Sequence, residues 1–136
     1  MMRPSAILES AIYAPDLDAA ERFYTEVLGL EKITRAGNRH VFFRCGEGVL
    51  LVFNPEETVK PWMEGQLPVP PHGARGQCHI CFRATGDELD AWQAKLESLG
   101  IEVESTVEWP GGGRSIYFRD PAGNSLEFAE PKIWGF

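Results

Sequence analysis

Long apolar runs are missing from this sequence. No stretch approaches the roughly 18–20 consecutive apolar residues that a membrane-spanning helix needs. The first ten residues, MMRPSAILES, also lack the apolar core of a secretory signal. We therefore expect a cytoplasmic protein with no membrane partner.

Cysteine is scarce as well, with three in 136 residues. An odd number without an export signal favours free thiols over a disulfide framework. Cys78 and Cys81 form a C-x-x-C pattern, but it falls in a predicted strand. Side chains three positions apart on a strand point to opposite faces, so these two cannot bind one ion together. Cys81 is expected to line a cavity, and Cys78 to be buried.

Positive charge is in short supply. The chain has 13 Lys and Arg against 20 Asp and Glu, a net charge of −7, and the cationic residues are scattered. Nucleic acids and anionic membranes both require a clustered basic face, so neither is expected as a partner. Hydrophobic residues at 43% and a length of 136 residues are typical of one globular domain that folds without disulfides or structural metal.

Two similar amphipathic helices are predicted. The first is PDLDAAERFYTEVLGLE, with Asp16 as N-cap and Gly29 as its stop. The second is GDELDAWQAKLESLGIE, which ends at Gly100. Its apolar stripe consists of Leu89, Trp92, Leu96 and Leu99.

The likeness of the helices extends to an internal repeat. EVLGLE (26–31) aligns with ESLGIE (97–102) at an offset of 71, and RHVFFRCGEGVLLVF (39–53) aligns without a gap with RSIYFRDPAGNSLEF (114–128) at an offset of 75. With a strand before each helix, this predicts an α+β fold of paired βαβββ modules. Module one spans about 5–56, a proline-rich connector about 57–76, and module two about 77–131, all within a single domain 1–136.

Three polar side chains occupy predicted strands. In SLEFA, Leu126 and Phe128 share one face, so Glu127 points to the other. The same alternation separates His79 from its apolar neighbours in QCHICF and Glu9 from those in LESAI. Each has an ordinary alternative, a solvated carboxylate or a hydrogen-bonded histidine. Their shared placement on the faces away from the helices favours a metal site over these alternatives without excluding them.

These motifs resemble the vicinal oxygen chelate superfamily, which includes glyoxalase I, extradiol dioxygenases, and fosfomycin- and bleomycin-resistance proteins. The match rests on ESAIYAPDLDAAERFYTEVLGLE, GQCHICF and IYFRDPAGNSLEF, and it covers nearly the whole chain. The resemblance implies a cupped mixed sheet around a metal cavity, usually completed in a homodimer.

The resemblance also implies a ligand set. His79 and Glu127 match family ligands, and Glu9 lies where members commonly have His or Gln. The position of a fourth ligand aligns with Val52, or with Leu51 after a one-residue shift, so at most three protein ligands are expected for one divalent ion, Fe, Mn, Ni or Zn. Glu127 or Glu9 is then the expected catalytic base. The further cavity candidates are Tyr13, Cys81 and Tyr117.

Two functions remain open from the sequence. One is a metal-dependent lyase, isomerase or dioxygenase that chelates adjacent oxygens of a small substrate, with each site shared between two chains. The other is a metal-free binding protein of the bleomycin-resistance kind, which holds an aromatic or cationic ligand by stacking, with Trp62 and Trp109 in loops. His40 and His72 are expected at the surface. The cations available for a phosphonate site are isolated: Arg35, Arg39, Arg114, Arg119 and Lys132.

Overall fold

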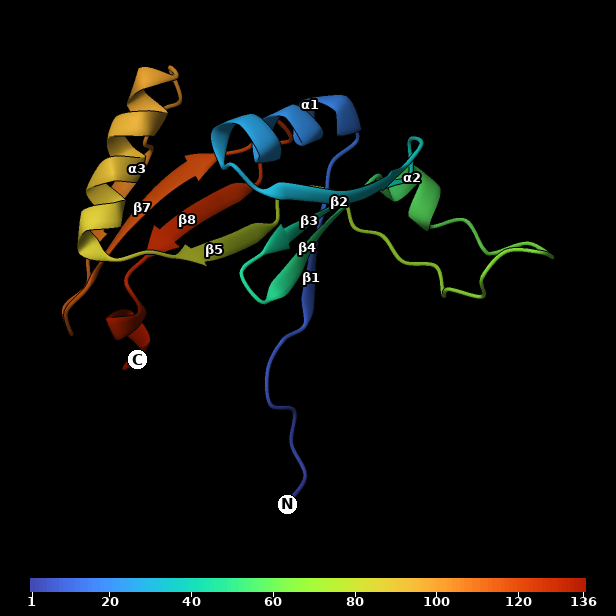
Figure 1. Ribbon diagram of the computed structural model, residues 1–136, viewed down its shortest axis with the longest axis horizontal. Coiled ribbons are helices and arrows are strands. Elements are labelled where there is room, and N and C mark those ends of the chain that lie inside the picture. Colours follow the sequence, from blue (N-terminus) through green and yellow to red (C-terminus); the bar gives the residue numbers. More distant parts are fainter. The chain divides into compact units, whose positions relative to one another are not determined.

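The computed structural model describes residues 1–136, and the chain divides into two compact units, Met1–Gly76 and Gln77–Phe136. Each unit contains one four-stranded mixed sheet and a helix that crosses one side of it (Figure 1). The expected α+β fold of paired βαβββ modules is confirmed by the order of the elements.

In unit 1 the strands lie in the order β1-β4-β3-β2, with β1 parallel to β4 and the other neighbours antiparallel. Its elements are β1 (Glu9–Tyr13), α1 (Leu17–Arg22), the π-helical turn η1 (Phe23–Val27), β2 (Glu31–Ala36), β3 (His40–Cys45), β4 (Gly48–Phe53) and α2 (Pro55–Thr58).

The first helix begins and ends where the sequence predicts. The Asp16 side chain accepts a hydrogen bond from the Ala19 amide at 3.0 Å, as an N-cap does. Gly29 ends the helical segment with a φ of 71°, a conformation that other residues adopt only with strain. Leu17 and Tyr24 are fully buried beneath the helix and fix it on the sheet.

Unit 2 repeats this plan with the strand order β5-β8-β7-β6. Its elements are β5 (His79–Arg83), α3 (Gly86–Ser98), β6 (Ser105–Glu108), β7 (Arg114–Arg119), β8 (Ser125–Ala129) and the 3₁₀ turn η2 (Pro131–Trp134). None of the helices is long and apolar enough to cross a membrane.

Helix α3 packs on its sheet through the predicted stripe, with one exception. Leu89 and Leu96 are fully buried, and Trp92 stacks on Phe128 with the ring centroids 4.5 Å apart. The prediction for Leu99 was wrong, because this residue is the C-cap, follows the last helical residue and is 51% exposed. The packed stripe therefore ends one turn earlier than the sequence indicates.

The structure also corrects the alignment of the two modules. Glu127 pairs with Cys81 across β8 and β5, and the equivalent pair across β4 and β1 is Leu51 with Ala11. Val52 instead faces the helix and is fully buried. The DPAGN turn holds one residue more than the gapless alignment allows, so Leu51 is the counterpart of Glu127.

The segment that joins the units is less irregular at its start than predicted. It begins with the short helix α2, capped by the Asn54 side chain, which accepts from the Glu56 amide at 3.1 Å. The rest contains no helix or strand as far as β5. A hydrogen bond from the His72 amide to the Thr58 carbonyl at 3.0 Å ties the far end of this segment back to α2.

Candidate functional site

The strongest candidate for a metal-binding pair lies on the sheet of unit 2, on the face away from α3. His79 opens β5, and Glu127 is central in β8. The His79 Nε2 and Glu127 Oε1 atoms are 3.2 Å apart. The Glu127 side chain is only 7% exposed, so its charge is largely removed from water, whereas the His79 side chain is 52% exposed. A buried carboxylate requires a compensating positive charge or hydrogen-bond donors.

The hydrogen bond on the other side of the His79 ring fixes its tautomer. His79 Nδ1 lies 2.9 Å from the Ser125 carbonyl oxygen, which can only accept, so Nδ1 carries a hydrogen. In the neutral ring, Nε2 then presents its lone pair to the Glu127 oxygen. Two lone pairs facing each other at 3.2 Å repel unless a proton or a metal cation lies between them.

The separation of these two atoms also fits a metal ion. Ligand nitrogen and oxygen atoms that each lie about 2.1 Å from an ion, at angles between 90° and 109°, are about 3.0–3.4 Å apart. The observed 3.2 Å lies within that range. A backbone carbonyl that orients a ligating histidine is a common feature of metal sites. The residues present in unit 2 therefore fit two of the three expected ligands.

Cys81 and Tyr117 complete the surroundings of Glu127. They are its direct neighbours on β5 and β7, and the Cys81 thiol donates to the Phe82 carbonyl at 3.7 Å. Burial raises the pKa of the Cys81 thiol to about 12, with further contributions from the Glu127 charge and hydrogen bond. Burial and Glu127 likewise raise the pKa of Tyr117. Both groups are protonated donors at neutral pH.

Trp109 lies beside this face. Its indole nitrogen donates to the Ser115 hydroxyl at 2.9 Å, and Ser115 is two positions before Tyr117 on β7 and fully buried. Trp109 is 39% exposed. An indole held in this way gives the face an apolar border next to the polar group of Glu127.

The turn before β8 holds Glu127 in register with β5. The Asp120 carboxylate accepts from the amides of Ala122 and Asn124 at 3.0 and 2.9 Å. The Asn124 side chain donates to Asp120 at 2.9 Å and accepts from the Cys78 amide at 2.9 Å. Asn124 therefore connects the turn to the residue immediately before His79.

Unit 1 contains a large open cavity on the sheet face away from α1. Its volume is about 1470 Å³, and the segment after α2 forms one of its walls. The floor of the cavity is lined by Ala11, Val49 and Leu51. Leu51, the counterpart of Glu127 in unit 1, therefore lies on an apolar surface. Trp62 lines it from the connecting segment, whereas the sequence predicted only a loop position for this residue.

Polar side chains gather at the end of the cavity where β1 ends and β3 begins. The Tyr13 hydroxyl lies 2.8 Å from His72 Nδ1. Arg39 Nη1 lies 2.7 Å from His40 Nδ1, and the Arg39 guanidinium also lies 5.7 Å from the ring centroid of Phe53. Burial and the Arg39 charge lower the pKa of His40.

His40 and His72 line the cavity, so the prediction of surface positions for both was wrong. The alternation of His40 and Phe42 against the buried Val41 and Phe43 in β3 carried a signal that His40 faces the cavity. The segment containing His72 has no periodicity, so nothing in the sequence indicates that it folds back to Tyr13.

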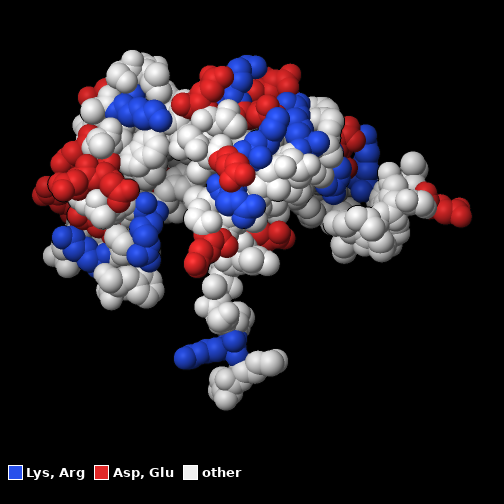
Figure 2. All heavy atoms as spheres, in the orientation of Figure 1, with Lys and Arg blue, Asp and Glu red and all other residues white.

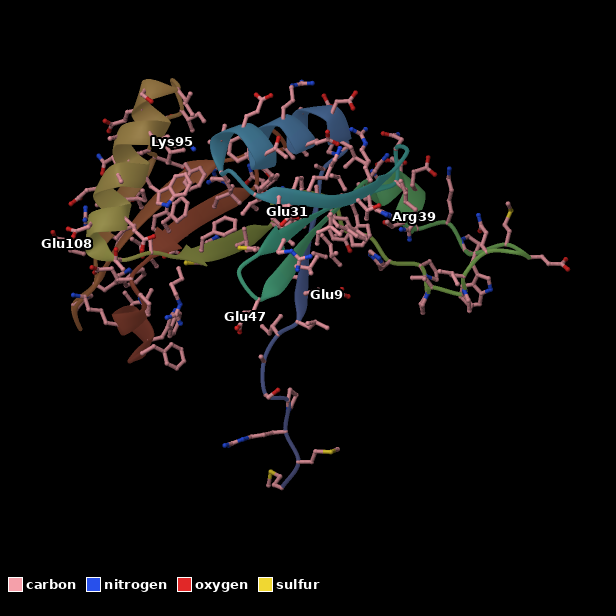
Figure 3. All side chains as sticks on the ribbon, viewed as in Figure 1. Glu9, Glu31, Arg39, Glu47, Lys95 and Glu108 are labelled. Carbon is pink, nitrogen blue, oxygen red and sulfur yellow. The ribbon has the colours of Figure 1, made fainter.

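Glu9, the third expected ligand, belongs to unit 1. It is exposed at the start of β1 and lines the end of the cavity opposite to Tyr13. Figure 3 shows Glu9 near the start of β1 and Arg39 near α2. Nowhere in the chain do three or more His, Cys, Asp or Glu side chains gather in a metal-binding cluster. The structure thus brings His79 and Glu127 together within unit 2, and Glu9 lies in unit 1.

Comparison with known proteins identifies the class. A family model described as Glyoxalase/Bleomycin resistance protein/Dioxygenase superfamily matches residues 6–128. The chain therefore belongs to this superfamily, the group whose motifs its sequence resembles.

The relatives of this chain include one protein named as a lyase and one named as a transferase. A crystal structure of a lactoylglutathione lyase from Agrobacterium tumefaciens is 49% identical, with a TM-score of 0.95, and the alignment covers 99% of this chain and 100% of that one. The metallothiol transferase FosB of Bacillus licheniformis is 30% identical over 113 residues, 82% of this chain and 66% of FosB. The fold is also shared with the fosfomycin resistance protein FosX of Listeria monocytogenes, whose structure is a complex with Mn(II) and 1S,2S-dihydroxypropylphosphonic acid. The identity is 21% and the TM-score 0.67, over 93% of this chain and 90% of FosX.

Proposed function

We propose that this protein is a divalent-metal-dependent enzyme that acts on a small oxygenated molecule, with Glu9, His79 and Glu127 as the protein ligands. The observation that carries the proposal is the 3.2 Å separation of His79 Nε2 and Glu127 Oε1, with His79 Nδ1 turned to the Ser125 carbonyl. Two relatives support the proposal: FosB is named a metallothiol transferase, and the FosX structure contains Mn(II).

Three protein ligands leave coordination positions open for adjacent oxygens of a substrate. A divalent ion bound there would polarise those oxygens as a Lewis acid. Glu127 is the candidate base, because its carboxylate is buried between Cys81 and Tyr117 on the neighbouring strands, and both of these groups are protonated at neutral pH. A protonated Tyr117 hydroxyl beside the carboxylate would stabilise the charged form that accepts a proton.

The proposal includes a cytoplasmic homodimer in which Glu9 of one copy meets His79 and Glu127 of the other. Three free cysteines support a reducing compartment. The location of Glu9 in unit 1 and of the other two ligands in unit 2 is what a shared site requires.

Metal content tests the proposal most simply. We expect untagged protein purified without chelator to contain about one divalent ion per chain, and added Mn, Fe, Ni or Zn to raise the melting temperature of the stripped protein, as binding to the native state does. If no ion is found and none of the four raises the melting temperature, the proposal is wrong.

Mixing two inactive variants tests the shared site. Glu9→Ala and His79→Ala should each lose metal, but a refolded mixture should regain it, because a heterodimer has one site with all three ligands. A mixture of Glu9→Ala with itself is the control. If the mixture binds no more metal than either variant alone, the ligands are not shared between copies.

The second candidate is a metal-free binding protein. The observation in its favour is the aromatic lining of the unit 1 cavity, where His40 stacks on Phe42 with centroids 4.0 Å apart and Phe53 lies across His72 at 4.6 Å. Such rings bind flat apolar ligands well. The two functions differ in how ligand binding depends on metal. A metal-free binding protein would bind its ligand with the same affinity after complete removal of metal.

A further inference from the structure

Arg39 differs from every other cation of the chain. Eight of the 13 Lys and Arg residues form ion pairs with carboxylates. Of the other five, only Arg39 is partly buried, and the rest are exposed: Arg3, Arg22, Arg83 and Lys95. In the view of Figure 2, blue and red atoms are interspersed over the surface, as ion pairing would produce.

The contacts of Arg39 leave its charge uncompensated. One guanidinium nitrogen meets His40 Nδ1 at 2.7 Å, and the guanidinium lies over the Phe53 ring. Neither partner is an anion. In a chain with a net charge of −7, a half-buried arginine without a carboxylate partner is costly unless something negative binds to it.

A neutral hydrogen-bond donor stands beside this arginine. His40 accepts from Arg39 through Nδ1, so its Nε2 carries the hydrogen and can donate. The ring partners of Arg39 and His40 are Phe53 and Phe42, and all four residues line the cavity. An oxyanion here would meet a guanidinium fork and an imidazole N–H within an aromatic wall.

We infer that the Arg39 end of the unit 1 cavity binds the carboxylate or phosphonate group of an elongated ligand whose apolar body lies along the cavity floor. The inference rests on the proposed function, because it assigns this cavity to the substrate. Glu9 and Tyr13 are four residues apart on β1, about 13 Å. Arg39 precedes β3, two strands away from β1, so the anionic group binds more than about 13 Å from the proposed metal ligand Glu9, and the reacting oxygens belong to the opposite end of the substrate.

Three small probes of similar size test the inference on metal-free protein: 3-phenylpropanoate, phenylphosphonate and the neutral 3-phenylpropanamide. Binding is followed by quenching of tryptophan fluorescence and by the NMR signals of His40, whose ring should become protonated at a higher pH when an anion is bound. We expect one or both anions to bind and the amide to bind about tenfold more weakly, as the loss of a charged hydrogen bond implies. The stronger anion identifies the head group.

Arg39→Gln and Arg22→Gln form a matched pair, because both remove one positive charge from unit 1, but Arg22 is exposed on the helix side. We expect Arg39→Gln to weaken anion binding about tenfold and to leave amide binding unchanged, and Arg22→Gln to change neither. Equal melting temperatures show that both variants are folded.

The inference is overturned if wild type binds the amide as tightly as both anions, or if Arg39→Gln binds the anions as tightly as Arg22→Gln. Failure of the proposed function has a different signature. In that case the stripped protein takes up no divalent ion, while binding of the anions to Arg39 is unaffected.

Discussion

Replacement of Asn124 by alanine should loosen the part of unit 2 that aligns Glu127 with His79. Asn124 is fully buried and joins the turn at Asp120 to the Cys78 amide at the start of β5. Alanine removes both contacts but leaves the backbone free to keep its conformation.

The magnitude follows from the two lost hydrogen bonds. An amide hydrogen left without an acceptor costs about 1–3 kcal/mol, and a hydrogen bond to a carboxylate contributes about 1.5–3 kcal/mol. Because the two share one residue they are not fully additive, and we expect Asn124→Ala to lower the free energy of unfolding by about 3 kcal/mol. For a chain of this length that corresponds to a melting temperature about 10 °C lower.

Thermal unfolding followed by circular dichroism measures the loss, and urea unfolding with an unchanged m-value confirms that the native state keeps its compactness. Asn38→Ala is the control, because Asn38 is exposed and contributes only its backbone carbonyl to Asn54, so its effect should stay within about 0.5 kcal/mol. If Asn124→Ala is as stable as Asn38→Ala, the turn does not hold the two strands together.

Two further predictions follow, one for unit 1 and one for unit 2. Burial and the Arg39 charge hold the pKa of His40 below its ordinary value of 6.5. As the pH falls, His40 therefore takes up a proton in the unfolded chain at a higher pH than in the native protein. The free energy of unfolding consequently decreases as the pH drops below 6.5. Urea unfolding of His40→Gln should show a weaker loss between neutral and acidic pH, and an identical pH dependence in variant and wild type would contradict this. In the capping box of α3, the Thr85 hydroxyl accepts from the Glu88 amide at 3.2 Å and the Glu88 carboxylate accepts from the Thr85 amide at 3.0 Å. Thr85→Ala should therefore cost about 1 kcal/mol in thermal unfolding, and Thr85→Ser almost nothing; equal losses in the two variants would exclude capping as the cause.

The fold could be predicted because its signals are local and repeated. Caps such as Asp16, glycine stops such as Gly29 and the alternation around Glu127 each depend on a few neighbouring residues. The errors occur where a single residue changes the register. One additional residue in the DPAGN turn moves the counterpart of Glu127 from Val52 to Leu51, and no gapless alignment reveals this.

The candidate site was only partly accessible to sequence reasoning. The faces of His79 and Glu127 follow from strand alternation, and the structure adds the 3.2 Å separation and the tautomer fixed by Ser125. The cavity residue His72 could not have been predicted, because its position depends on how an aperiodic segment folds back to Tyr13. The expected set of three ligands remains a prediction.

Calorimetric titration of metal-free protein with Mn(II) and Zn(II) tests the central claim most directly. Wild type should bind one ion per chain, His79→Ala and Glu127→Gln should bind none, and Glu47→Gln, which changes an exposed turn carboxylate, should match wild type. Stoichiometric binding by Glu127→Gln with the affinity of wild type would contradict the assignment of the His79 and Glu127 pair as a metal site.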